Sequence, residues 1–144
     1  FAGTVAASFQ EHFQQQLPLL PNVKFVGALN LDTLAAVQGL CDIGFCFYNS
    51  MYGGELADPA PNKIGDYIAG NLWMIASGQD FIQSVLHPQQ LGLALNDITA
   101  DSITKAMHDI MSRPNFRHPQ HIRQFFENTF NMQVQALPVL HHLK

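Results

Sequence analysis

Charged residues are scarce in this chain of 144 residues, and positive charge is scarcer still. Aspartate and glutamate number 11 against 7 lysines and arginines, and charged residues make up only 12% of the chain. A protein that binds nucleic acid through its phosphates is expected to carry a basic stripe, which this composition does not supply. We therefore expect no nucleic-acid partner, and a domain so poor in charge is expected to pack against another part of a protein.

Long apolar runs and cysteines are also few. No apolar segment approaches the roughly 20 residues that cross a bilayer, and no signal peptide is recognisable, so the sequence predicts a cytoplasmic protein. The two cysteines, Cys41 and Cys46, flank and lie in one apolar run. We expect them to be thiols of the core and not to form a disulfide.

Metal sites and the common nucleotide and hydrolase motifs are missing as well. His118 and His121 are three residues apart, and His141 and His142 are adjacent, but neither pair has a third ligand at a suitable spacing. We therefore expect no bound metal. The sequence has no Gly-x-Ser-x-Gly, no Walker loop and no Gly-x-Gly-x-x-Gly, which removes support for hydrolase, nucleotide triphosphatase and dehydrogenase functions.

What the sequence does have is an alternation of short apolar segments and amphipathic helices. The apolar spacing predicts helices at 8–17, 31–40, 62–69, 80–86, 101–111 and 119–130, and strands at 23–26, 42–47, 72–76 and 91–95. Segment 42–47 is apolar on both faces, as expected of a central strand covered by helices. The chain is long enough for one domain, and the pattern predicts an α/β fold with a Rossmann-like, doubly wound parallel sheet.

One helix start has the features of an anion site. Asn62 follows a proline-rich loop and is expected to cap the helix, which would leave the amides of Lys63 and Ile64 facing outward at the positive end of the dipole. A phosphate fits such a position. Asp66, one turn later, offers carboxylate oxygens to a ribose diol. The same residues also suit an ordinary capped helix, with Lys63 and Asp66 on a solvated face.

This segment resembles a known family. Residues 61–72 read Pro-Asn-Lys-Ile-Gly-Asp-Tyr-Ile-Ala-Gly-Asn-Leu and precede a predicted strand. They are similar to a segment of GT-B glycosyltransferases. That segment reads Pro-Asn-Lys, any two residues, Glu-Tyr-Met-Ala, a small residue and then Gly-Leu-Pro. Residues 22–27, Asn-Val-Lys-Phe-Val-Gly, are similar to an Asn-Val-x-Phe-x-Gly segment of the same proteins. The resemblance is to the retaining glycosyltransferase group 1 family.

The resemblance implies that residues 1–144 form the C-terminal, donor-binding lobe of a GT-B fold, with the N-terminal lobe and the first strand-helix unit absent from this chain. The full-length enzyme would transfer a sugar from a nucleotide-diphosphate sugar to an acceptor glycan or lipid-linked sugar in cell-surface polysaccharide biosynthesis. It would need no metal or other cofactor, and would sit in the cytoplasm, at the inner face of the membrane through the missing lobe. This fragment alone is expected to be inactive.

The resemblance also implies roles for particular residues. Gly27, Ala28 and Leu29 would lie near the base of the donor, together with Asn30. Asp66 would hold the ribose and Lys63 a phosphate. In the family a Glu-x7-Glu pair spans the preceding loop, and Asp58 and Asp66 have that spacing; either Asp58 or the neighbouring Glu55 would contact the donor sugar.

Several residues depart from the family pattern. Asp replaces Glu in the acidic pair, Asn71 stands at a Gly position, and Trp73 stands at a Pro position. Asparagine tolerates the left-handed backbone that the Gly would adopt, and Trp73 is expected to pack against the missing lobe. These departures keep two alternatives open: a degenerate, non-catalytic interaction module, and a GT-B sugar-nucleotide epimerase.

Overall fold

The computed structural model describes residues 1–48 and 62–136, so Glu55 and Asp58 lie outside the described residues. The chain divides into two compact units, Phe1–Val37 and Gln38–Lys144, which we describe one at a time. Within the described ranges, no helix is long and apolar enough to cross a lipid bilayer.

The first unit contains two of the predicted helices. α1 (Ala7–Gln16) continues into a 3-10 turn, η1 (Leu17–Leu19). Only part of the predicted apolar stripe of α1 is used: Phe13 meets Phe25 edge-to-face at 4.9 Å, whereas Phe9 is 64% exposed. α2 (Leu31–Gln38) starts after Asn30, whose side-chain oxygen accepts a hydrogen bond from the Thr33 amide at 2.8 Å. Asn30 is thus the N-cap of α2.

The prediction of a regular strand at 23–26 is wrong. This segment does lie beside the first residues of the chain, and three hydrogen bonds join them. Phe1 N donates to Lys24 O at 2.6 Å, Val26 N donates to Phe1 O at 2.9 Å, and Gly3 N donates to Gly27 O at 2.8 Å. The pairing is too short for a strand ladder, because Gly27 adopts a left-handed φ of 72° and turns the backbone away.

The second unit contains a parallel sheet of three strands. β1 (Ile43–Cys46), β2 (Trp73–Ser77) and β3 (Gly92–Leu95) lie in the order β1-β2-β3. Cys46 pairs with Ala76 and Ala76 with Ala94, so the carboxyl ends of the strands are level. The prediction that segment 42–47 is the central strand is wrong, since β2 lies between the other two and all five of its residues are buried.

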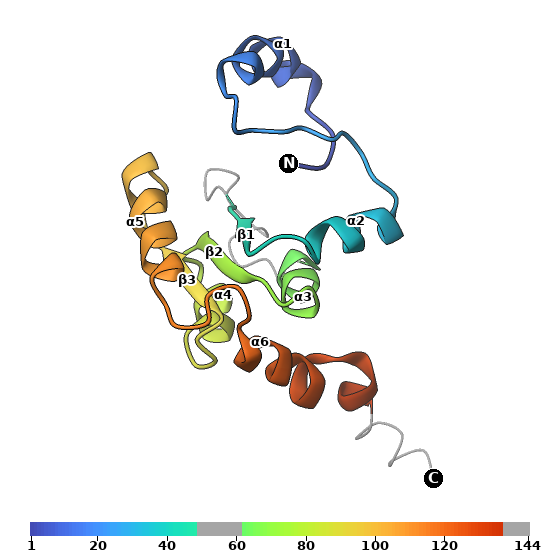
Figure 1. Cartoon of the computed structure of the whole chain (residues 1–144), viewed down its shortest axis with the longest axis vertical. Helices are drawn as coiled ribbons and strands as arrows, with labels where there is room; N and C mark the ends of the chain where they lie inside the picture. The colour runs from blue at the N-terminus through green and yellow to red at the C-terminus, as the bar shows by residue number, and fades with distance from the viewer. Residues whose placement is uncertain (49–61, 137–144) are drawn as a thin grey trace. The chain divides into compact units, whose positions relative to one another are not determined.

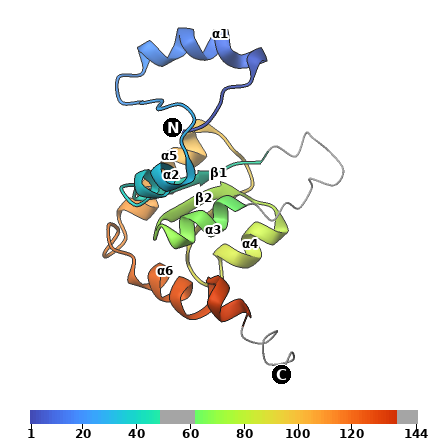
Figure 2. The same ribbon diagram turned by 90° about the vertical axis from the view of Figure 1, so that its right-hand side faces the viewer.

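Helices cover both faces of this sheet, which places the protein in the α/β class. α3 (Asn62–Ala69) contacts β1 and β2, and α4 (Asp80–Leu86) contacts β2 and β3. α5 (Ala100–Met111) contacts β2 and β3 from the opposite side. Figure 1 shows α5 and α3 on either side of the sheet, and Figure 2 shows α3 and α4 in front of β2. The core lies between these layers, and α3 buries Ile64 and Ile68 in it.

The predicted end of α3 is confirmed, and α5 begins with a side-chain cap. Asn71, after α3, has a left-handed φ of 62°, which ends the helix as a glycine would. Thr99 caps α5: its hydroxyl accepts a hydrogen bond from Ser102 N at 3.2 Å, and Ser102 Oγ accepts one from Thr99 N at 3.0 Å. This reciprocal pair is a capping box.

The expectation that Trp73 packs outside this chain is wrong. Trp73 is 4% exposed, and its indole N–H donates to the Phe116 carbonyl at 2.8 Å. The Arg113 guanidinium lies 4.9 Å from the ring, and the His121 imidazole 5.0 Å from it. His121 belongs to α6 (Gln120–Phe125), which continues into a π-helical turn, Phe126–Phe130. The two cysteines are not joined in a disulfide, but only Cys46 is a core thiol, because Cys41 is exposed.

The contact between α3 and β1 generates a stability prediction. A Cβ on Gly44 would lie 2.5 Å from the Tyr67 ring, so Gly44→Ala must displace Tyr67 or the strand. We expect the free energy of unfolding, measured by urea denaturation, to fall by about 1–3 kcal/mol.

Gly65→Ala is the matched control on α3. Its added Cβ would make an ordinary contact of 3.5 Å with Phe130, and alanine favours a helix interior over glycine by about 1 kcal/mol. Equal stability of Gly44→Ala and the unaltered protein would contradict the packing described here.

Candidate functional site

The carboxyl ends of β1 and β2 are tied together by hydrogen bonds. Tyr48 N donates to Ser77 Oγ at 2.9 Å, and Ser77 Oγ donates to the Cys46 carbonyl at 3.4 Å. Gln79 Nε2 donates to the Tyr48 carbonyl at 3.2 Å. Parallel α/β sheets commonly bind ligands beyond this edge. These bonds therefore hold two chain segments in place where a ligand would be expected.

A hollow of about 220 Å³ opens at the same edge. It reaches from the end of β1 across β2 to the end of β3, and we call it the carboxyl-edge hollow. Its lining includes Tyr48, Ser77, Gly78, Gln79, Asn96 and Ile98, which bring hydroxyl and amide groups but no charged side chain. Gln79 Oε1 is a buried acceptor with no donor within the described part of the chain. The hollow suits an uncharged, hydrogen-bonding group.

The first turn of α3 stands beside this hollow. Asn62 and Lys63 are exposed, and Lys63 Nζ lies 6.0 Å from the centre of the Tyr48 ring. Ile64 is buried, so its side chain is in the core and only its amide is available at the helix end. The prediction that Asn62 caps α3 is not confirmed: Asn62 is the first residue of the helix, and the capping position before it lies outside the described ranges. The structure thus places a cationic side chain and the first residue of a helix at the carboxyl edge.

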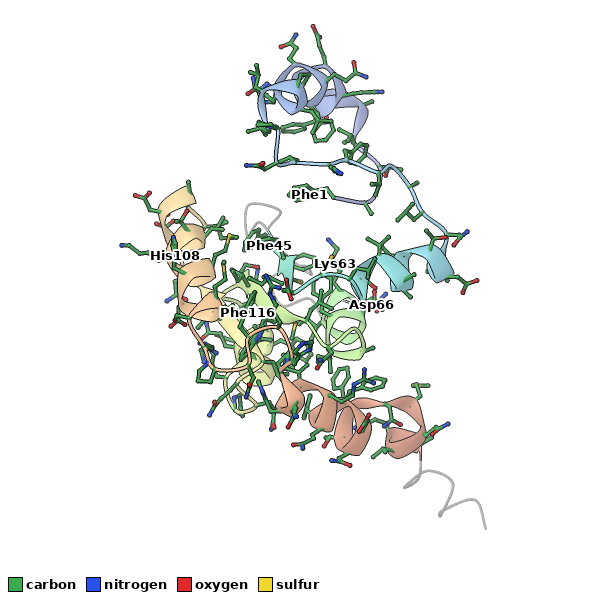
Figure 3. The ribbon with its side chains drawn as sticks, in the orientation of Figure 1. Phe1, Phe45, Lys63, Asp66, His108 and Phe116 are labelled. Carbon is green, nitrogen blue, oxygen red and sulfur yellow. The ribbon has the colours of Figure 1, made fainter. Side chains whose placement is uncertain are left out.

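Asp66 lies on α3 one turn beyond Asn62, as Figure 3 shows together with Lys63. Its side chain is exposed, and it forms no ion pair with any described residue. Because α3 runs away from the carboxyl edge, Asp66 is about 6 Å farther from that edge than Asn62. A ligand that uses both the helix start and Asp66 must extend along the outside of α3.

The residues expected near the base belong to the first unit. Gly27 has the left-handed backbone described above, Ala28 is exposed and Leu29 is half-buried. Asn30, expected to lie near the base as well, uses its side-chain oxygen to cap α2. Glu55 and Asp58, the expected sugar ligands, lie outside the described residues.

Burial changes the acidity of three groups near this edge. Desolvation raises the pKa of the Cys46 thiol and of the Tyr48 hydroxyl, which share a side-chain hydrogen bond. Desolvation also raises the pKa of Tyr67 to about 12. Tyr67 donates a hydrogen bond to the Phe45 carbonyl at 3.1 Å, which further commits it to the neutral form. These groups therefore stay protonated at neutral pH and act as neutral hydrogen-bonding partners.

The sequence interpretation missed Tyr48, Ser77, Gln79 and Asn96. Each of them ends or closely follows an apolar segment that became a strand. That position was the available signal, since polar residues after parallel strands gather at one edge of a sheet. No short sequence motif contains all of them, because they come from the three segments that end or follow β1, β2 and β3.

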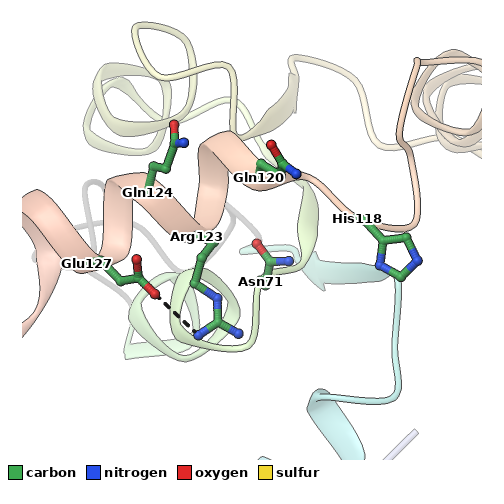
Figure 4. A pocket seen from close by; sticks show the side chains of 6 residues that line it. All are labelled: Asn71, His118, Gln120, Arg123, Gln124 and Glu127. Atoms are coloured by element: carbon green, nitrogen blue, oxygen red, sulfur yellow. Dashed lines mark ion pairs between the residues drawn. The ribbon is translucent and has the colours of Figure 1, made fainter.

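Two other hollows lie elsewhere in the second unit. One, of about 310 Å³, is formed by Asn71 and the side chains of α6 and the residues before it, as shown in Figure 4. Arg123 and Glu127 line it and are 3.7 Å apart, an exposed pair of little energetic weight. It contains none of the residues predicted to bind a ligand, and Asn71 was predicted only to end the helix. The second lies at the first residues of β2 and β3, Trp73 and Gly92.

No group of three or more His, Cys, Asp or Glu side chains suited to a metal occurs among the residues that the structure describes. No protein-family model matches the chain, and its sequence matches no curated protein. A functional assignment therefore depends on the residues and the geometry above.

The environment of Tyr67 predicts a pH dependence of stability. Between the ordinary pKa of tyrosine, about 10, and its folded-state pKa, about 12, the folded protein keeps a proton that the unfolded chain loses. The free energy of unfolding should therefore fall as the pH rises through this window. In Tyr67→Phe the free energy of unfolding should fall less steeply over this pH range. At neutral pH it should already be about 1 kcal/mol lower than in the unaltered protein, because the hydrogen bond to the Phe45 carbonyl is absent.

The measurement is urea denaturation of both proteins at about pH 8 and at intervals up to about pH 12. Lysines and the other phenols ionise in both proteins, so the difference between the two curves isolates Tyr67. Parallel curves would show that the Tyr67 hydroxyl has the same acidity in the folded and unfolded states.

Proposed function

We propose that this chain is the donor-binding, C-terminal lobe of a GT-B glycosyltransferase, with a Rossmann-like, doubly wound sheet. The full enzyme would transfer a sugar from a nucleotide-diphosphate sugar to an acceptor glycan or lipid-linked sugar at the cytoplasmic face of the membrane. The observation that carries the proposal is the position of the first turn of α3, exposed with Lys63 at the carboxyl edge and next to Tyr48. The resemblance of residues 61–72 to that family supports it from the sequence.

In this proposal α3 binds the diphosphate of the donor. The amides at a helix start have no partner within the helix, and they point toward the ligand with the positive end of the dipole. The Lys63 ammonium adds a mobile positive charge there. As the sugar leaves, negative charge builds up on the diphosphate, and fixed dipoles aimed at that charge lower the barrier. Lys63 and the amides of α3 thereby do the work that a metal does in other transferases.

The remaining groups would hold the other parts of the donor. Asp66 accepts hydrogen bonds from the ribose hydroxyls, which fits its exposed carboxylate and its lack of an ion-pair partner among the described residues. The roles of Gly27, Ala28 and Leu29 at the base, and of Asp58 or Glu55 at the sugar, rest on the family resemblance alone. The acceptor is bound by the other lobe of the enzyme, so this chain alone binds nucleotide weakly and transfers nothing.

Two features favour a second candidate, a non-catalytic interaction module. The acidic pair is shortened from Glu to Asp, and Asp66 stands one helical turn away from the carboxyl edge. Both features lengthen the distance between the Asp66 carboxylate and a nucleotide bound at the carboxyl edge, which the ribose would have to span. A sugar-nucleotide epimerase of the same fold is distinguished by its reaction: it converts a nucleotide sugar when no acceptor is present.

The test is nuclear magnetic resonance of the ¹⁵N-labelled chain titrated with UDP and, separately, with GDP. We expect saturable shifts of the Lys63, Ile64 and Gly65 amides, with a Kd of roughly 1 mM. Lys63→Ala should weaken binding about tenfold, since a charge-assisted hydrogen bond contributes about 1.5–3 kcal/mol. Asp66→Asn should weaken nucleotide binding but leave the binding of inorganic pyrophosphate unchanged.

Lys105→Ala is the control, because Lys105 is an exposed lysine on α5, on the other face of the sheet. It should bind both nucleotides as the unaltered chain does. If neither nucleotide changes the chemical shifts of the α3 amides, the transferase proposal is rejected and the interaction module is favoured. An equal loss of nucleotide affinity in Lys63→Ala and Lys105→Ala would show that the loss comes from the lower overall charge and not from a phosphate contact of Lys63.

A further inference from the structure

A third hollow, of about 500 Å³, lies at the opposite edge of the same sheet. Trp73 and Gly92, the first residues of β2 and β3, form its floor. Its walls are His87 after α4, Gln90, Arg113 and Pro114 after α5, and His121 of α6. We call it the amino-edge hollow. It shares no lining residue with the carboxyl-edge hollow.

The Arg113 guanidinium is held from two sides. Its Cζ lies over the Trp73 ring, 4.9 Å from the ring centre, and Nη2 donates to Asp109 Oδ2 at 2.8 Å. Asp109 occupies one edge of the guanidinium, and its own side chain is 54% exposed. A guanidinium has five N–H donors in a planar fork, so a stacked and anchored Arg113 still presents donors in a fixed direction.

His121 is also held in place. Its Nε2 lies 3.0 Å from the Gln90 carbonyl, and a carbonyl can only accept, so Nε2 carries a proton. When the ring is protonated, Nδ1 becomes a second donor that is not needed for this contact. Gln90 reaches His121 through a left-handed backbone, with φ of 52°. Such a conformation is costly for a glutamine, and it is retained where the surroundings require it.

Arg113, His87 and His121 line the hollow. No carboxylate is among its lining residues in the described part of the chain, although the chain as a whole carries a formal net charge of −4. An arginine and two imidazoles that line one cavity can donate hydrogen bonds to the oxygens of a phosphate group. The volume exceeds that of a phosphate alone, which leaves room for an organic part.

We propose that the amino-edge hollow binds a small phosphorylated molecule, with its phosphate on Arg113, His121 and His87. This site is separate from the proposed donor site, because the two lie at opposite edges of the sheet. It therefore holds whether or not the chain binds a nucleotide sugar.

Trp73 is the only tryptophan of the chain, so its fluorescence reports on this hollow alone. The experiment is titration of the full chain with inorganic phosphate, with sodium chloride at matched ionic strength and with acetate as parallel arms. We expect a saturable change of Trp73 emission with phosphate only. The change should depend on the phosphate concentration and reach a plateau, because the Arg113 donors line a single hollow.

His87→Gln removes an exposed imidazole without disturbing the Trp73 packing, and should weaken phosphate binding about fivefold. Arg113→Gln should abolish it, with the circular dichroism spectrum checking that the variant is folded. His118→Gln, which alters the hollow of Figure 4 instead, should bind as the unaltered chain does. No saturable response to phosphate, an equal response to chloride or acetate, or unchanged affinity in His87→Gln would each overturn the proposal.

Discussion

The burial of β2 is the constraint on which the second unit depends. β2 pairs with a strand on each side and buries all five of its residues, while α3, α4 and α5 pack on its two faces. A strand covered in this way has every backbone group paired and every side chain out of water, so its position is fixed by many contacts at once. Its two ends line the two hollows: Ser77 lies in the carboxyl-edge hollow, and Trp73 lies in the amino-edge hollow.

Local structure was largely predictable from the sequence. The helices at 62–69 and 80–86, the left-handed Asn71 and the Thr99 cap follow from apolar spacing and from residue types that act over one turn. Strand order was not predictable in the same way, because it depends on pairing between distant segments. Segment 42–47 is as apolar as a central strand, yet β1 has one neighbouring strand among the described residues, and segment 23–26 is held by too few hydrogen bonds to be a strand.

The candidate site, too, was predictable only where it depends on neighbouring residues in the sequence. The sequence located Lys63 and Asp66, because capping and helix dipoles are local effects, and it assigned them to a nucleotide through a family resemblance that remains a proposal. It did not find Tyr48, Ser77 or Gln79, since their significance comes from hydrogen bonds between the segments that follow β1 and β2. Trp73 was misplaced for a related reason: its partners, Arg113, Phe116 and His121, follow it by forty residues or more.

The central claim is that the start of α3, at the carboxyl edge of the sheet, receives a diphosphate. The most direct measurement is a crystal structure of the chain grown with UDP or GDP. The account predicts the diphosphate against the amides of Lys63 and Ile64, within reach of the Lys63 ammonium, with the ribose toward Asp66. A nucleotide bound elsewhere on the chain, or a helix start closed off by residues 49–61, would contradict it.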